Sequence, residues 1–217
     1  MKNYSFTEQR KLPVSVYRGL LMIFIRIPLL RTFFETRGTA APVTLRTWFI
    51  QKVLGVNRRA YWPMHFSSLV SNVGNIVTGI GTAPGLSPGC YIQGIGRLEI
   101  GDYTIIAPNV GIITANHDLY DFRIHHPSSV KIGRYCWIGI NAVIMPNIEL
   151  GDHTIVAAGS VVTDSFPEGY CVIAGNPAKC VRKLRKEECV KYRNPHEYYG
   201  YIKKNKFAAY RKKHLAM

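Results

Sequence analysis

Residues 114–129 concentrate side chains that could carry out acid–base or metal chemistry. The stretch contains three histidines, two aspartates and an arginine, with asparagine, proline and serine between them. A histidine can accept and return a proton near neutral pH, and three histidines together can hold a metal ion. The histidines of the stretch are His117, His125 and His126, and His153 follows further along the chain. Which chemistry is open to them depends on the elements that hold the stretch in place.

An aliphatic residue recurs at every sixth position on both sides of this stretch. A helix needs a period near 3.6 and a half-buried strand a period of two, so neither explains a period of six. Six residues make one short strand and one corner, which is the repeat of a parallel β-helix whose stacked coils bury the aliphatic position. The recurring residues are Ile100, Ile106 and Ile112 before the stretch, and Ile132, Ile138, Ile144, Leu150, Val156 and Val162 after it.

The interval from Ile112 to Ile132 is 20 residues, which is not a multiple of six. Its polar side chains cannot fill the aliphatic core position, so we expect residues 114–129 to leave the coil as a loop. The coils themselves are expected over about 66–164. Pro63, Pro84 and Pro88 are expected to open irregular early coils.

Residues 63 to 184 resemble the hexapeptide-repeat acyltransferases, and among these the sugar and polysaccharide O-acetyltransferases. Four features carry the resemblance in the family's order: the hexads, NHD at 116–118, CWIG at 136–139 and GNPAK at 175–179. The resemblance implies an all-β core, a left-handed parallel β-helix with helical N- and C-terminal extensions. It also implies a homotrimer with active sites between subunits. The implied division is a basic, partly helical extension at 1–62, a catalytic domain at 63–181 and a basic, aromatic-rich extension at 182–217.

The resemblance also implies acetyl-CoA as the donor, with no metal. In it His117 is the general base, which takes the proton of an acceptor hydroxyl and returns it to the CoA thiolate. The other interpretation of His117 is a loop histidine that caps a turn. Asn116 and Asp118 could meet the acceptor or fix the loop by hydrogen bonds to its backbone. The implied acceptor-side residues are Asn116, Asp118, Arg123, Tyr91 and Gln93.

The donor side is implied for the later coils. Trp137 is expected beside the reacting centre, or else in a subunit contact. Small residues would let the pantetheine arm approach the backbone, and cations after the last coil suit the CoA phosphates. Ile140 stands where some sugar acetyltransferases have an oxyanion-binding serine, so we expect a backbone N–H of Gly139 or Ile140 to serve instead. The implied donor-side residues are Trp137, Gly139, Ala158, Gly159, Ser160, Thr163, Lys179 and Arg182.

The acceptor stays open at this level. We expect O-acetylation of a sugar or surface-glycan hydroxyl, with N-acetylation of a nucleotide-linked amino sugar as an alternative for the same site. A hexapeptide-repeat carbonic anhydrase and a non-catalytic scaffold are the rivals from other classes. The motif at 175–179 favours CoA over a metal, and His153 falls at a coil corner away from the loop.

The net charge of +15 lies in the two ends of the chain. Residues 1–62 carry 11 basic and 2 acidic groups and residues 182–217 carry 12 and 3, whereas residues 63–181 carry 5 and 8. Nucleic acid is not indicated, because its enzymes usually place the basic residues around the catalytic region. An anionic membrane surface would attract such ends.

Residues 17–34 are apolar with three interspersed arginines. This pattern suits a helix lying in a membrane interface, or one packed on the trimer itself. Five cysteines without a CxxC pair indicate a reducing compartment. We therefore expect a cytoplasmic protein with peripheral association at the inner face of the membrane.

Overall fold

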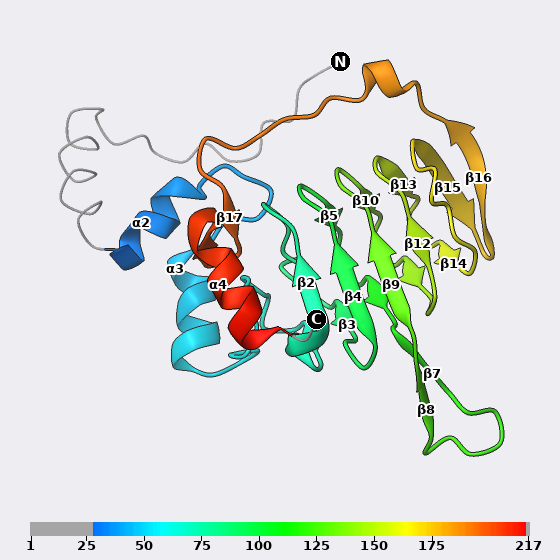
Figure 1. Ribbon diagram of the computed structural model, residues 1–217, viewed down its shortest axis with the longest axis horizontal. Coiled ribbons are helices and arrows are strands. Elements are labelled where there is room, and N and C mark those ends of the chain that lie inside the picture. The colour runs from blue at the N-terminus through cyan, green and yellow to red at the C-terminus, as the bar shows by residue number, and fades with distance from the viewer. Residues whose placement is uncertain (1–27, 216–217) are drawn as a thin grey trace.

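A computed structural model describes residues 28–215, in which short parallel strands stack into a coil with three faces (Figure 1). The first face contains β1 (Leu69–Val70), β3 (Tyr91–Ile92), β6 (Gly111–Ile112), β11 (Val143–Ile144) and β14 (Val161–Val162). The second contains β5 (Ile105–Ile106), β10 (Trp137–Ile138), β13 (Thr154–Val156), β15 (Cys171–Gly175) and β16 (Ala178–Lys183). The third contains β2 (Ile76–Thr78), β4 (Arg97–Ile100), β9 (Ser129–Ile132) and β12 (Glu149–Leu150).

The hexad residues lie in the interior of this coil and stack on one another. Ile106, Ile138 and Val156 are aligned across three neighbouring strands of the second face. All nine hexad residues are at most 6% exposed. Burying a column of large aliphatic side chains stabilises the stack, because each removes apolar surface from water. The predicted parallel β-helix is therefore confirmed.

The stack extends further than the hexads predict. β15 pairs in parallel with β13, so the second face continues beyond residue 164. β16 then folds back antiparallel to β15, and the turn between them contains a cis peptide bond before Pro177. The GNPAK sequence thus forms a hairpin that closes the coil at its C-terminal end.

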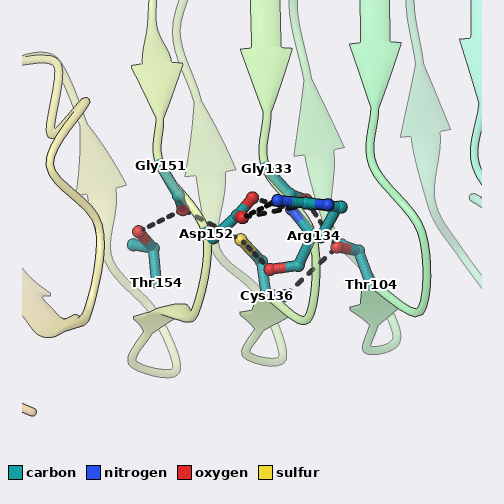
Figure 2. Close-up of polar contacts among 7 residues, drawn as sticks. All are labelled: Thr104, Gly133, Arg134, Cys136, Gly151, Asp152 and Thr154. Atoms are coloured by element: carbon teal, nitrogen blue, oxygen red, sulfur yellow. Dashed lines mark hydrogen bonds and ion pairs between the residues drawn. The ribbon is translucent and has the colours of Figure 1, made fainter. Parts of the chain in front are cut away.

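The corners between the third and second faces are tied to one another by polar contacts (Figure 2). The hydroxyl of Thr104 donates to the carbonyl oxygen of Gly133 at 2.7 Å. One carboxylate oxygen of Asp152 accepts the backbone N–H of Arg134 at 2.7 Å, and the other pairs with its guanidinium. A Cβ on Gly133 would lie 2.6 Å from the backbone nitrogen of Asp152, so neighbouring coils can approach this closely only at a glycine.

The N-terminal end of the coil is covered by helices, which Figure 1 shows in blue and cyan. They are α2 (Pro28–Glu35), α3 (Leu45–Trp48) and the π-helix η1 (Phe49–Val53), whereas the short 3-10 helix η2 (Val73–Asn75) lies within the first coil between β1 and β2. The buried amide of Gln51 donates to the carbonyl oxygens of Ala60 and Trp62 and accepts the N–H of Met64. This single side chain therefore fixes η1 to the segment that leads into the first coil.

The C-terminal segment returns along the coils to the same end of the molecule (Figure 1). After η3 (Lys186–Glu188) it forms β17 (Tyr198–Tyr199), β18 (Ile202–Lys203) and α4 (Lys204–His214). The rings of Tyr199 and Phe207 stack at 3.7 Å, and Phe207 also packs on Tyr61. These aromatic side chains hold α4 against the segment that precedes the first coil, so they do not form a free surface for lipid or glycan.

The apolar stretch at 17–34 is described only in part, since residues 17–27 lie outside the described range. Within α2, the ring of Phe33 meets Trp48 edge-on at 6.4 Å. Glu35 pairs with Arg31 and accepts a hydrogen bond from Tyr198. None of the helices within residues 28–215 has the length and hydropathy needed to cross a bilayer.

Candidate active site

The polar stretch leaves the coil, as predicted, but as an antiparallel hairpin that projects from the body of the molecule (Figure 1). Its strands are β7 (Ala115–His117) and β8 (His125–Pro127), with His117 directly opposite His125. At its base the N–H of Thr114 donates to the side-chain oxygen of Gln93 at 2.9 Å. Gln93 is buried and supports the hairpin from within the coil, whereas Tyr91, two residues earlier, is exposed on the first face.

His117 is held by a hydrogen bond that determines which of its nitrogens carries the proton. Its Nδ1 lies 2.5 Å from the carbonyl oxygen of Phe122. A carbonyl oxygen only accepts, so Nδ1 must donate, and the lone pair of the neutral ring is left on Nε2. The ring of His125 packs beside it with centroids 4.2 Å apart. His117 therefore presents an exposed proton acceptor in a fixed orientation.

Asp118 organises the turn that follows His117. Its Oδ1 accepts the N–H groups of Tyr120 and Asp121 at 2.9 and 3.0 Å, and its Oδ2 lies 3.0 Å from Nε2 of His126. The His126 hydrogen bond, followed by the two backbone N–H groups, lowers the pKa of Asp118 to about 2. Of its two expected roles, Asp118 fills the loop-fixing one, while Asn116 stands exposed on β7 opposite His126.

The tip of the hairpin exposes apolar side chains together with Arg123. The Arg123 guanidinium binds both carboxylate oxygens of Asp121, at 2.9 and 2.8 Å, and stays almost fully in solvent. Leu119, Tyr120 and Phe122 are each more than 70% exposed. A projecting, apolar tip of this kind indicates a surface that meets another molecule.

Trp137 stands on a different part of the coil from the hairpin. It lies on β10 of the second face, more than half exposed, with Ile105 and Ile155 beside it in register. The hairpin leaves the corner between β6 of the first face and β9 of the third. The fold of one chain therefore places His117 and Trp137 on separate parts of the coil.

The two expected oxyanion donors differ. The N–H of Gly139 donates to the carbonyl oxygen of Val156 at 2.8 Å, and a Cβ there would lie 2.7 Å from the nitrogen of Ala158. Gly139 is thus committed to the strand ladder, and the expectation that its N–H binds an oxyanion is wrong. The N–H of Ile140 has no hydrogen-bond acceptor among residues 28–215.

The small residues of the last complete coil also separate into two kinds. Ala158, Gly159 and Thr163 are exposed, and a Cβ at Gly159 would meet nothing within 4 Å. Ser160 is buried, and its hydroxyl oxygen accepts the N–H of Gly175 at 3.2 Å. The corner at 158–159 is therefore open to a ligand, whereas the Ser160 hydroxyl is used in a hydrogen bond within the coil.

Lys179 and Arg182 lie on β16, at the end of the coil. Lys179 forms an ion pair of 2.7 Å with Asp164, and both side chains are more than half exposed. Arg182 is exposed on the same strand. Asp164 was not anticipated from the sequence, because its pairing with Lys179 depends on how β16 folds back on β15.

His153 is separated from the histidines of the hairpin. It is buried at a corner with its ring stacked between those of Tyr135 and Tyr170, at 5.0 and 5.1 Å. Within the described part of the chain, no group of three or more His, Cys, Asp or Glu side chains has a metal-binding arrangement.

This coil and its hairpin define a class of protein. Residues 129–164, from β9 to β14, match the family model described as "Bacterial transferase hexapeptide (six repeats)". Residues 129–164 therefore carry the transferase hexapeptide repeat, and the hexapeptide-repeat neighbours imply that the β-helix is left-handed.

Individual relatives are acetyltransferases by name. The Escherichia coli K12 protein "Putative lipopolysaccharide biosynthesis O-acetyl transferase WbbJ" is 36% identical over 110 residues, which are 45% of this chain and 56% of that protein. The chain spans about half the length of the curated relatives it matches.

Solved structures extend the likeness over more of the chain. The crystal structure of a maltose O-acetyltransferase from Clostridium difficile 630 has 27% identity and a TM-score of 0.50, covering 77% of this chain and 89% of that one. A galactoside acetyltransferase in complex with coenzyme A has a TM-score of 0.55 over 88% of this chain and all of that one. At 19% identity, this second likeness concerns the fold alone.

Proposed function

We propose that this protein is an acetyl-CoA-dependent O-acetyltransferase that acts on a sugar or glycan hydroxyl, with His117 as general base. The hydrogen bond from Nδ1 of His117 to Phe122 carries the proposal, because it leaves Nε2 free to accept a proton. The names of the maltose and lipopolysaccharide relatives support a sugar acceptor.

The proposed reaction is a direct transfer. Nε2 of His117 takes the proton as the acceptor oxygen attacks the thioester carbonyl carbon. The resulting oxyanion would be stabilised by the N–H of Ile140, which is available where that of Gly139 is not. When the carbon–sulfur bond breaks, the same nitrogen returns its proton to the departing thiolate. Atoms and charge balance without a metal.

The donor site is proposed along the second face and its C-terminal end. The corner at Ala158 and Gly159 is open enough for the pantetheine arm to approach the backbone. Lys179 and Arg182 would bind phosphate groups, and Lys179 must exchange Asp164 for the ligand when it does so.

A site that contains both His117 and Trp137 requires a second copy of the chain. We therefore propose a homotrimer in which the hairpin of one subunit faces the second face of its neighbour. The exposed Tyr120 and Phe122 would be covered in that contact, as would Ile105 beside Trp137. The proposed location is the cytoplasm, at the inner face of the membrane where glycan precursors are accessible.

The test is release of free CoA from acetyl-CoA by the purified protein, measured against a panel of oligosaccharides and amino sugars. Acetylation of a hydroxyl in one of them, identified by mass spectrometry, would support the proposal. Release that requires an amino sugar would point to N-acetylation, and no release with any acceptor, together with no CoA binding, would favour a scaffold.

A further inference from the structure

The helical end of the molecule exposes an apolar surface that the proposed reaction does not use. η1 follows directly after α3, and on the inner side of η1 the buried Gln51 side chain donates to the carbonyl oxygen of Trp62. Leu45, Phe49 and Val53 are spaced four residues apart and are each about half exposed or more. Residues at this spacing share one side of a helix. This segment therefore presents a continuous apolar side to solvent.

A second segment extends the same surface. The side-chain amide of Asn57 donates to the carbonyl oxygen of Ser68 at 2.7 Å, which holds the chain after η1 against residues 65–69. Large apolar side chains are exposed on both segments. We call this surface the cap face, and its apolar members are Leu45, Phe49, Val53, Leu54, Val56, Phe66 and Leu69.

The charge around the cap face has one sign. Residues 36–98 contain six basic residues and no aspartate or glutamate. Arg46, Arg58 and Arg59 are exposed. Arg58 and Arg59 also line a recess of roughly 470 Å³ between residues 55–59 and 70–73. Lys52 is not part of this group, because its ammonium donates to the carbonyl oxygens of Arg58 and Ala60.

We propose that the cap face docks on an anionic lipid bilayer. Its apolar side chains would enter the interface, and Arg58 and Arg59 would hold a headgroup phosphate in the recess. The same face of a second copy is a poor occupant, because it would bring arginines together without an acidic residue to pair them. A bilayer supplies both the apolar layer and the negative charge. This inference does not depend on the proposed reaction.

The experiment is flotation of the full chain with vesicles of phosphatidylcholine alone, or of phosphatidylcholine and phosphatidylglycerol in equal parts. The protein should float only with the mixed vesicles. Arg58→Gln with Arg59→Gln should lower the partition coefficient at low salt by about tenfold or more. Phe49→Ser with Leu54→Ser should also lower the binding that persists at high salt, since apolar burial is not screened.

Two matched pairs of substitutions control for charge and hydrophobicity elsewhere. Lys183→Gln with Lys191→Gln removes two exposed cations near the other end of the coil, and Val181→Ser with Val190→Ser removes two exposed apolar side chains there. Both control variants should float like the original protein.

Three results would overturn the proposal: no flotation of the original protein, equal losses in the control variants, or full binding by both cap-face variants. A change in the mass of the assembly in the cap-face variants would instead make this face a contact between copies. If those variants do not fold, hydrogen exchange of the original protein decides. Exchange within residues 45–69 should slow when mixed vesicles are added, and unchanged exchange would rule out docking there.

Discussion

Nδ1 of His117 lies 2.5 Å from the carbonyl oxygen of Phe122, five residues further along the same hairpin. Through this contact the backbone of the hairpin determines the tautomer and the orientation of the His117 ring. It holds the proton on Nδ1 and turns Nε2 outward as the acceptor. In many histidine bases a carboxylate has this role, whereas here Asp118 is occupied with the turn and with His126.

Replacing His117 should therefore abolish most of the turnover without disturbing the coil. His117→Ala is expected to lower kcat by about 10²–10⁴-fold, the range for losing a general base, with CoA affinity and assembly mass unchanged. His65→Ala is the matched control, because it replaces a histidine in the segment that leads into the first coil, and it should keep full activity. The measurement is steady-state CoA release, and near-normal kcat in the His117→Ala protein would exclude this mechanism.

The hairpin should loosen in acid because of Asp118. Its pKa is depressed in the folded protein, from 3.8 to about 2, so its contribution to hairpin order is present above pH 4. That contribution is lost as the pH falls through about 2. Asp118→Asn should show the loosened hairpin already at neutral pH, because the charge that His126 contacts is gone. Hydrogen exchange at residues 118–126 measures this, and equal protection in the two proteins at pH 6 would contradict it.

The cations on β16 are expected to distinguish CoA thioesters by their 3′-phosphate. Lys179→Ala with Arg182→Ala should raise KM for acetyl-CoA more than KM for the dephospho donor. Asp164→Asn should have the opposite effect on KM for acetyl-CoA, because it removes the carboxylate that competes for Lys179. Lys212→Ala with Lys213→Ala is the control for general charge. Equal changes with both donors would show that these side chains do not contact that phosphate.

Two glycines of the coil should respond differently to the same added methyl group. Gly133→Ala places a Cβ 2.6 Å from the nitrogen of Asp152 in the next coil, whereas in Gly111→Ala the nearest atoms are 3.7 Å away on Val143. We expect Gly133→Ala to lower the free energy of unfolding by about 2 kcal/mol or more, and Gly111→Ala to change it by about 0.5 kcal/mol or less. Thermal unfolding of both proteins at equal concentration tests this, and similar midpoints would contradict the packing at the corner.

The coil could be predicted because its signal is local and repeated. Each hexad places one residue inside, so Ile138 and Val156, three uninterrupted hexads apart, align in neighbouring coils. The register of the hairpin could not be predicted from the sequence, because the pairing of His117 with His125 depends on a turn held by Asp118. The role of the C-terminal aromatics was equally hidden. Tyr198, for example, donates to Glu35, 163 residues away, and no local pattern encodes such a contact.

Residues 1–27 and the cap face should contribute separately to vesicle binding. The structure determines where a deletion can end, because removing α2 as well would take away Glu35, which Tyr198, Lys203 and Arg31 all contact. A deletion of residues 1–27 keeps those contacts. We expect it to weaken flotation with mixed vesicles while leaving the salt-sensitive binding due to Arg58 and Arg59.

Activity of the shortened protein on a soluble acceptor should be unchanged, since the hairpin and the second face lie outside the deleted segment. Combining the deletion with Arg58→Gln and Arg59→Gln should then remove the remaining binding at low salt. If the deletion alone removes all flotation at low salt, residues 1–27 hold the protein to the vesicle without the cap face. If the deletion leaves flotation unchanged, residues 1–27 do not contribute to the membrane contact, and the apolar pattern at 17–27 has another role.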